Sequence, residues 1–242
     1  MQTKGQGFWV LLSSALVSGG IALGGFFISE TLYKSRVALN TADVKGLAER
    51  RVQSDKAYWS VSYSVNGLSN SEVPNLYKTS ESDQETIIGL LKESGFEDSE
   101  IQPGILNYQK AEYRDENQKL VEEKHILVGQ IDVETEKVHL VAKVRAKLNK
   151  LIAQGLNITN NEPSYYFTKL NDIKPDMLRE ATKNARLAAN EFAENAGVSV
   201  GGIRNARQGG FIIRDVGASY GDSRKIEKEV RVVTNVTFLL TE

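Results

Sequence analysis

The sequence predicts an α+β fold in which helices pack on a mostly antiparallel sheet, preceded by one transmembrane helix. Three observations lead to this class. An uncharged run covers residues 8–29, apolar and polar residues alternate over 57–66, and three segments with helical periodicity end at glycines. Because hairpin-type connections link most strand segments, the order β-β-α-β-β-α-β-α-β-β favours antiparallel pairing with helices packed on the sheet.

The first feature along the chain is a predicted membrane anchor at residues 8–29, preceded by a short tail at 1–7. These 22 residues carry no charge. As a helix they extend about 33 Å, which is enough for a hydrocarbon core of about 30 Å. The next residues, 30–43, are predicted to form a short polar connector to the soluble part.

A cleaved signal peptide is the alternative interpretation of the same segment. Lys4 precedes the apolar stretch, and the small residues Gly20 and Ala22 resemble a cleavage site. The apolar run continues to Ile28, beyond that point. This continuation favours an anchor that is retained.

The predicted anchor contains two pairs of small residues spaced four apart. Ala15 pairs with Gly19, and Gly20 pairs with Gly24. Such pairs let two membrane helices approach closely, so they predict an oligomerisation face within the membrane. The alternative is that glycine is simply frequent in membrane helices.

The soluble part begins with two predicted strands and a helix. Strict alternation of apolar and polar residues predicts the strands at 44–52 and 57–66. The helix is predicted from a capping box formed by Ser82 and Glu85 and from Gly95, which suits the position after a helix end.

The remaining elements are predicted from the same two periodicities. They are strands at 98–114 and 123–134 around a charged turn, a helix at 136–154, a strand at 156–168, a helix at 174–196, and strands at 199–214 and 227–241. No proline-rich or low-complexity linker interrupts residues 44–242. This continuity predicts one composite soluble domain.

The helix at 174–196 has the strongest helical periodicity. Pro175 is expected in its first turn and Gly197 directly after its end. Side chains at steps of three or four residues form its predicted packing face: Leu178, Ala181, Ala185, Ala188, Phe192 and Ala196. Because this face is rich in alanine, we expect the helix to pack closely on a sheet.

The composition excludes several classes of chemistry. The chain has 30 Lys+Arg and 31 Asp+Glu, and this balance argues against a dedicated nucleic-acid binder. With no cysteine, disulfides, thiol catalysis and Cys-ligated metals are excluded, and two histidines leave little room for a metal site. We therefore expect no cofactor and no metal ion.

Two motifs have a chemical interpretation and a plainer one. Residues 217–221 match the G-x-S-x-G string of serine hydrolases, but both histidines, His125 and His139, precede Ser219 and a strand follows. A flexible loop is the favoured interpretation. The two histidines with a nearby carboxylate are an imaginable metal site, although isolated histidines are usually solvated or hydrogen-bonded.

Two further clusters complete the candidates. The mixed charges of residues 112–124 predict a solvated hairpin tip. The aromatic run Tyr165, Tyr166 and Phe167 is a candidate binding surface, with division between a core and a sheet face as the alternative. Since none of these patterns forms a catalytic signature, we expect a protein that is not an enzyme.

Three segments of the soluble part resemble the SIMPL-domain family. They are residues 44–61 (VKGLAERRV, then DKAYWSV), 155–167, and 181–203 with its Ala/Arg-rich helix and Gly201-Gly202-Ile203. The resemblance covers residues 43–242, apart from a charged insertion at 114–124. It implies a bacterial, exported or membrane-anchored protein, in a family with some members linked to oxidative-stress defence and some that form oligomers. It supplies no catalytic residues.

These observations together predict a function that involves no catalysis. We expect a single-pass protein of the bacterial inner membrane with its soluble domain in the periplasm, acting as an oligomeric scaffold or as an envelope factor related to oxidative stress. If the anchor is cleaved, the protein is secreted or periplasmic. Two alternatives stay open: an exported module that binds a small molecule or cell-wall fragment, and an enzyme with an unrecognised carboxylate site.

Overall fold

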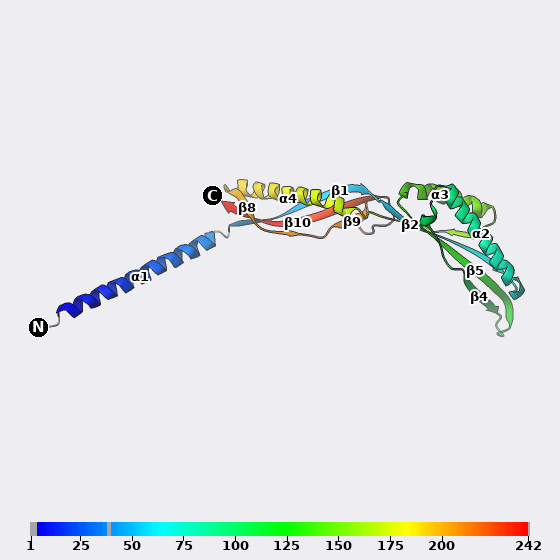
Figure 1. The fold of residues 1–242 in the computed structure, drawn as a ribbon, viewed down its shortest axis with the longest axis horizontal. Helices are drawn as coiled ribbons and strands as arrows, with labels where there is room; N and C mark the ends of the chain where they lie inside the picture. The colour runs from blue at the N-terminus through cyan, green and yellow to red at the C-terminus, as the bar shows by residue number, and fades with distance from the viewer. Residues whose placement is uncertain (1–3, 38–39, 242) are drawn as a thin grey trace. The chain divides into compact units, whose positions relative to one another are not determined.

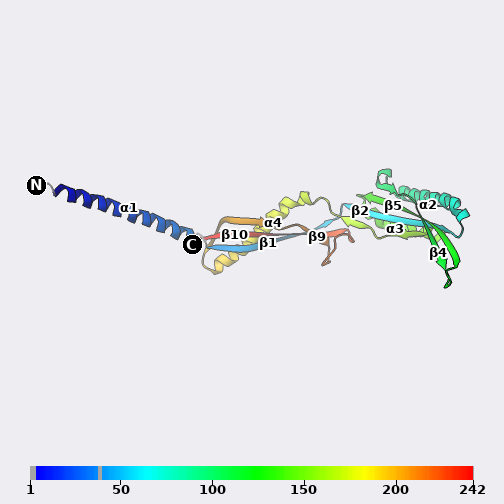
Figure 2. The same cartoon turned by 90° about the horizontal axis from the view of Figure 1, so that it is seen from below.

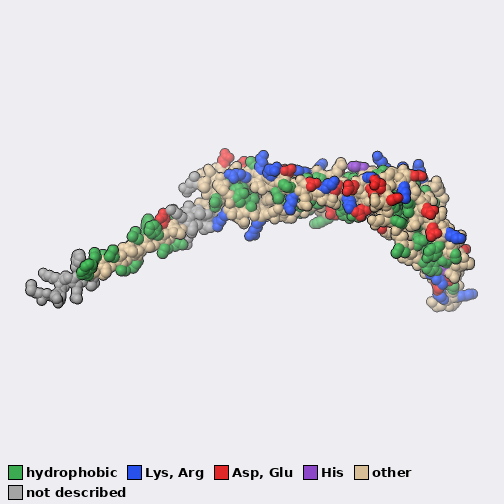
Figure 3. Space-filling model, viewed as in Figure 1, with side chains coloured by type: hydrophobic (Ala, Val, Ile, Leu, Met, Phe, Trp, Pro, Cys, Tyr) green, Lys and Arg blue, Asp and Glu red, His purple; other side chains and the backbone are tan. Residues whose placement is uncertain are grey.

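The structure, a computed structural model, describes residues 4–37 and 40–241. Its first element is helix α1 (Lys4–Val37), and the segment Leu12–Tyr33 is apolar and long enough to cross a membrane, with a mean hydropathy of 1.6 and no buried residues. Hydrophobic side chains are distributed along α1 in Figure 3. The predicted apolar helix is therefore present and could cross a membrane, whereas the first three residues of the predicted tail lie outside the described residues.

Helix α1 also includes much of the segment that we predicted to be a connector. It continues to Val37, and strand β1 (Thr41–Gln53) begins four residues later. Residues 30–37 contain no glycine and no proline. An established helix adds such residues readily, because each one contributes a hydrogen bond without a new nucleation step. Of the predicted connector at 30–43, residues 30–37 are helical, residues 41–43 belong to β1, and residues 38–39 are not described; its role as a connector stays a prediction.

The chain forms two compact units, which are described separately. Unit 1 combines residues 1–48, 178–210 and 232–242, and unit 2 combines 49–177 and 211–231. Strand β1, helix α4 (Leu170–Asn195) and strand β10 (Glu227–Thr241) each contribute residues to both units. Because the boundary falls within regular elements, no linker marks it in the sequence. A single domain over 44–242 stays a prediction.

Unit 1 is a sheet with the strand order β1-β10-β8, where β8 is Ser199–Gln208, and α4 lies along it (Figure 1). Strands β8 and β10 are antiparallel. Alternate residues of β1 are buried, as are alternate residues of β10. This confirms the period-2 pattern and shows that one helix layer covers one face of the sheet. The core consists of Ala42, Val44, Ala185, Ala189, Val236 and Phe238.

The contact between α4 and β1 is unusually close at Gly46. A Cβ atom on Gly46 would lie 1.8 Å from the carbonyl oxygen of Ala181 and 2.6 Å from the amide nitrogen of Ala185. No side chain fits between the two backbones at this point. Close packing of an alanine-rich helix was predicted, and Gly46 is the residue on the sheet that permits it.

The packing face of α4 differs from the predicted one in its register. The buried stripe consists of Met177, Ala181, Ala185, Ala189 and Ala193, whereas Phe192 is 64% exposed. Since the helix backbone lies directly on the sheet, a phenylalanine has no space on this face. The helix also begins at Leu170, so Pro175 stands inside it and not in its first turn.

Unit 2 contains an antiparallel sheet with the order β3-β5-β2-β6, in which β4 pairs with β5 and β7 with β2. Strand β9 (Ile212–Asp215), which pairs with the first part of β10, also belongs to this unit. The bounds of the other strands are β2 Lys56–Gly67, β3 Ile101–Pro103, β4 Asn107–Arg114, β5 Leu120–Thr135, β6 Ile158–Asn160 and β7 Ser164–Tyr166.

Helices α2 (Val73–Glu93) and α3 (Val138–Ala153) pack on one face of this sheet. Figure 2 shows them along β2 and β5. The core between the layers includes Trp59, Val61, Ile87, Leu91, Ile131, Val141 and Leu148. The opposite face of β2 and β5 carries the alternate, mainly polar residues. The sheet of unit 2 is therefore also covered on one face by helices.

Helix α2 begins nine residues before the predicted capping box. A short 3₁₀ turn, η1 (Asn70–Glu72), leads into it, and Pro74 occupies its first turn. Ser82 is inside the helix, where its carbonyl oxygen accepts a hydrogen bond from Thr86. The capping-box prediction is wrong, because proline at the first turn is the stronger start signal. Gly95 has a φ of +108° after the helix end, as predicted.

Three long predicted strands are each divided into shorter pieces. Residues 98–114 form the turn η2 (Asp98–Glu100) followed by β3 and β4. Residues 156–168 form β6 and β7, and 199–214 form β8 and β9. The breaks fall at Pro103-Gly104, at Pro163 and at Gly209-Gly210. Proline and glycine interrupt strands for backbone reasons, so these breaks were present in the sequence.

The Gly46 contact gives a direct prediction about stability. Replacing Gly46 with alanine forces α4 away from β1, and we expect the free energy of unfolding to fall by about 1–3 kcal/mol. Gly202→Ala in β8 is the matched control, because nothing lies within 4 Å of its Cβ position. Urea unfolding of the full chain in detergent measures both. Equal unfolding midpoints for the two variants would contradict the close contact.

Candidate functional site

The predicted aromatic cluster is divided between the two sides of the unit 2 sheet. Tyr165 is 6% exposed and belongs to the core, while Tyr166, its neighbour on β7, is 38% exposed. Neighbouring strand residues point to opposite faces, which explains the division. Tyr166 contacts Tyr58 edge to face, with ring centroids 5.7 Å apart. Phe167 is partly buried. A binding role for Tyr165, Tyr166 and Phe167 stays a prediction.

The open face of this sheet forms a continuous polar surface, which we call the polar sheet face. It consists of Lys56, Tyr58, Ser60, Gln102, Gln130, Asp132, Glu134 and Tyr166. Ser60 donates a hydrogen bond to Asp132 Oδ1, and Gln130 Nε2 donates to both oxygens of Asp132 at 2.8 and 3.0 Å. The sequence alternation already placed Ser60 on the outward side, and Tyr58 is two residues before it in the same strand.

Two adjoining hollows lie on this face. One has a volume of about 220 Å³ and is lined by residues that include Tyr58, Ser60 and Asp132. The other has a volume of about 300 Å³ and lies at the end of the face, where Lys56 lines it together with Glu100, Thr135 and Glu136. Gln102 and Glu134 line both hollows. The hollows therefore form one extended, shallow site with two compartments.

Two neighbours on the polar sheet face hold Glu134 in its ionised form. Lys56 forms an ion pair with Glu134, and Tyr58 Oη donates to Glu134 Oε1 at 3.1 Å. These two partners hold the pKa of Glu134 below its usual range, and Lys56 has the larger effect. By contrast, burial raises the pKa of Asp83, which lies on α2. Glu134 can accept hydrogen bonds but is poorly suited to donate a proton as a general acid.

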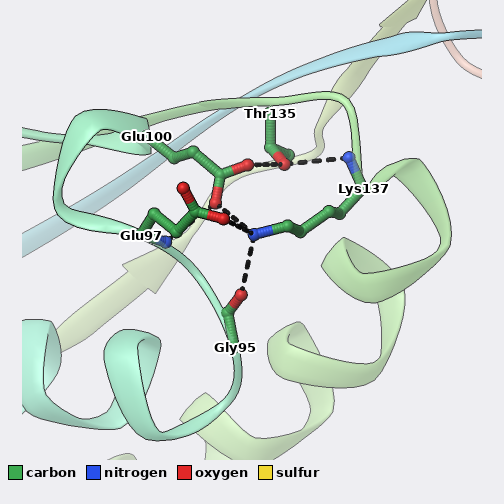
Figure 4. Close-up of polar contacts among 5 residues, drawn as sticks. All are labelled: Gly95, Glu97, Glu100, Thr135 and Lys137. Carbon is green, nitrogen blue, oxygen red and sulfur yellow. Dashed lines mark hydrogen bonds and ion pairs between the residues drawn. The ribbon is translucent and has the colours of Figure 1, made fainter.

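A cluster that lines the second hollow through Glu100 and Thr135 is structural (Figure 4). Lys137 Nζ donates to the carbonyl oxygen of Gly95 at 3.0 Å and contacts Glu97 and Glu100 at 2.9 Å. Thr135 Oγ1 donates to Glu100 Oε1 at 2.6 Å and accepts from the amide of Lys137. The cluster joins the end of α2 to the start of α3, and every labelled side chain in it has a partner.

The two histidines occupy different environments. His125 on β5 is 1% exposed, with Nδ1 2.6 Å from Tyr108 Oη and Nε2 2.7 Å from Glu123 Oε1. His139, in the first turn of α3, has Nε2 3.3 Å from Gln53 Oε1. Within residues 4–37 and 40–241, no group of three His, Asp or Glu side chains is placed to hold a metal ion.

The G-x-S-x-G string is a loop between β9 and β10, as favoured from the sequence. Gly217 and Gly221 have φ values of +77° and +91°. The loop is held by an ion pair that the sequence analysis missed. Lys228 is fully buried, and its Nζ lies 2.6 Å from Asp215 Oδ1 and 2.5 Å from the carbonyl oxygen of Asp222. Lys228 lies two residues before Val230 in β10, so the alternation along this strand places both side chains on the buried face. This alternation was the signal in the sequence that could have revealed the buried lysine.

Helix α1 and the charged hairpin complete the set of predicted sites. The hairpin tip at 114–120 is exposed, and Glu112 is paired with Arg114 and Lys110. Apart from the adjacent residues and the nearby backbone of α1 itself, no atom of the described residues lies within 4 Å of the Cβ positions of Gly19, Gly20 or Gly24. The small-residue face with Ala15 is thus open to a partner, and its role in oligomerisation stays a prediction.

Residues 42–238 match the family described as SIMPL, protein of unknown function (DUF541). The chain belongs to the SIMPL family. This match confirms the resemblance, and it includes the polar sheet face, the Lys228–Asp215 pair and the packing of α4 on β1. No curated protein matches the chain.

The buried ion pair of this SIMPL protein predicts a dependence of stability on pH. Burial raises the pKa of Asp215, but Lys228 and the amides of Arg224 and Lys225 outweigh burial and hold it below its usual range. A carboxyl whose pKa is lower in the folded state stabilises the fold above its unfolded pKa of about 3.9, and this stabilisation is lost as pH falls through the folded value.

We expect Asp215→Asn to lower the free energy of unfolding by about 3–5 kcal/mol at pH 7, because Lys228 is left buried without its anion. The difference between variant and wild type should shrink towards pH 3. Asp98→Asn, which removes an exposed partner of Lys92, is the control and should cost at most about 1 kcal/mol. Urea unfolding at both pH values measures this, and a pH-independent difference would contradict it.

Proposed function

We propose that this protein is a non-catalytic scaffold of the bacterial cell envelope, tethered to the inner membrane by α1 and assembled from copies that associate through the unit 1 sheet. Its soluble part is placed on the periplasmic side. The observation that carries this proposal is the free edge of β1, which is paired with β10 on one side and with no other strand in residues 40–241.

The tether is supported by the properties of α1. Its large apolar side chains are exposed, with Leu16 and Ile21 each at 71% and Phe26 at 64%. Exposed apolar surface of this extent is unfavourable in water and favourable in a bilayer. An N-terminal helix of this kind, followed by a long soluble part, supports export of that part. Tethering also confines the copies to one plane, which raises their effective concentration.

The main-chain groups at the free edge can be identified from their neighbours. The carbonyl oxygen of Asn40 accepts a hydrogen bond from the amide of Leu240 on β10 at 2.8 Å, and the carbonyl oxygen of Gly46 accepts one from the side-chain hydroxyl of Thr234 on β10 at 3.5 Å. Even-numbered residues of β1 therefore direct their main-chain groups to β10, and odd-numbered ones direct theirs to the edge. Asn184 Nδ2 donates a hydrogen bond to the carbonyl oxygen of Leu47 at 2.8 Å, so this edge group already has a partner. Residues 43 and 45 are left for a further strand.

The side chains at this edge are complementary to a second copy. Asp43 and Lys45 are exposed on the uncovered face of the sheet. If two β1 strands pair antiparallel about Val44, Asp43 of one copy lies opposite Lys45 of the other, and the symmetry repeats this pair. Strand β8, at the other edge, has register shifts and carries Arg204 and Arg207, devices that discourage edge pairing.

Pairing through β1 is compatible with contact between the anchors. In this register the two Thr41 residues are six residues apart, which is about 20 Å along the strands. Residues 38–40 connect each strand to its α1, and three residues reach about 10 Å. The two helices can therefore approach to the 8–10 Å of packed helices, with Ala15, Gly19, Gly20 and Gly24 available as the contact face.

The charge pattern provides a test by reversal. Lys45→Glu places two like-charged pairs in the dimer, and at about 0.2–1 kcal/mol per pair we expect association to weaken about 2- to 30-fold. Adding Asp43→Lys to this variant restores complementarity and should restore association. Lys183→Glu, on the exposed face of α4, is the control. Analytical ultracentrifugation of the full chain in nonionic detergent measures the dimer, and a strictly monomeric wild type would contradict the proposal.

A further inference from the structure

We propose that the polar sheet face of unit 2 binds a neutral, hydroxyl-rich sugar chain, with one sugar ring in each of its two hollows. This site is separate from the β1 edge, so the inference does not depend on self-association. It rests on three features of the face: the hydrogen-bonding groups that are still available, the exposed pair of tyrosine rings, and the size and shape of the hollows.

The available hydrogen-bonding groups match those that sugar hydroxyls require. A hydroxyl both donates and accepts, so it pairs best with a carboxylate beside an amide. Both hydrogen-bonded partners of Glu134, Lys56 and Tyr58, contact its Oε1. The side-chain amide of Gln102 has no hydrogen-bond partner within the described part of the chain. Because Glu134 and Gln102 line both hollows, this pair of groups lies where two adjacent rings would meet.

The tyrosine pair supplies the apolar part of the site. Tyr58 is 42% exposed and Tyr166 is 38% exposed, and their rings meet at an interplanar angle of 77°. A sugar ring has a face of C–H groups that packs on an aromatic ring, while a tyrosine hydroxyl stays in contact with polar groups. Tyr58 borders the first hollow. Its hydroxyl is fixed by Glu134, so the ring is already ordered before a ligand binds.

The dimensions and the charge restrict the ligand further. The hollows measure about 220 and 300 Å³, at or below the lower end of the roughly 300–1,000 Å³ of pockets that enclose a compact ligand. Two shallow compartments side by side suit an extended chain better than a compact molecule. Asp132 and Glu134 on the same face disfavour anionic ligands. The lowered pKa of Glu134 fits binding of hydroxyls and does not fit acid catalysis of sugar cleavage.

The test uses the full chain in lipid nanodiscs, because many detergents carry sugar head groups. Chitotetraose, a chain of four N-acetylglucosamine units, and cellotetraose are titrated by isothermal calorimetry. We expect at least one of them to bind, and Tyr58→Ala to weaken that binding about tenfold. Tyr113→Ala removes a tyrosine of unit 2 that is 52% exposed but lies on β4, and it should leave binding unchanged.

Two further variants separate a sugar site from a cation site. Gln102→Ala should weaken sugar binding about three- to tenfold. Glu134→Gln removes the negative charge and should also weaken binding, but by no more than this, because the new amide oxygen still accepts a hydrogen bond. Tetralysine is titrated in parallel. Binding of tetralysine without binding of either sugar, and its loss in Glu134→Gln, would overturn the proposal. Equal affinities of Tyr58→Ala and Tyr113→Ala for the sugar would overturn it as well.

Discussion

The contact between Gly46 and the backbone of α4 determines the packing of unit 1. Because a Cβ atom at position 46 would lie 1.8 Å from the carbonyl oxygen of Ala181, helix and strand approach at the backbone. Beside this contact the buried stripe of α4 consists of alanines, and Phe192 lies outside the stripe. The same contact also brings Asn184 to the carbonyl oxygen of Leu47, so one part of the β1 edge is closed and residues 43 and 45 are left open.

Both units have the same two-layer arrangement, with helices on one face of a sheet. Helix α4 covers one face of the first sheet, and α2 with α3 covers one face of the second. The second face of each sheet carries mainly polar and charged side chains, and these faces differ in chemistry between the two units. In unit 1 the edge strand carries opposite charges that suit a copy of itself. In unit 2 tyrosines, amides and carboxylates surround two hollows that suit a polar ligand.

Sequence patterns predicted the class of the fold, the order of its elements and its apolar N-terminal helix, because alternation, helical periodicity and the absence of charge are local properties. They failed where tertiary contacts decide. The register of the α4 stripe depends on Gly46, which is distant in sequence. Pro74 in the first turn of α2, and the strand breaks at Pro103-Gly104 and Gly209-Gly210, could be recognised in the sequence. The longer alternating and helical patterns around them outweighed these local signals in the prediction. Of the candidate site, Tyr58 and Ser60 were predictable from their shared parity, whereas Gln102 was not, since only pairing of β3 with β5 places it beside Asp132.

The central claim is that two copies of this SIMPL protein pair through β1 about Val44. The absence of cysteine permits a direct measurement with introduced thiols, since paired antiparallel residues lie at the Cα separation of about 5.5 Å that a disulfide requires. Asp43→Cys and Lys45→Cys chains with different tags are expressed together in membranes and oxidised. The account predicts a disulfide-linked dimer containing both tags, and little from either variant alone. Absence of the mixed dimer, or equal cross-linking within each single variant, would contradict it.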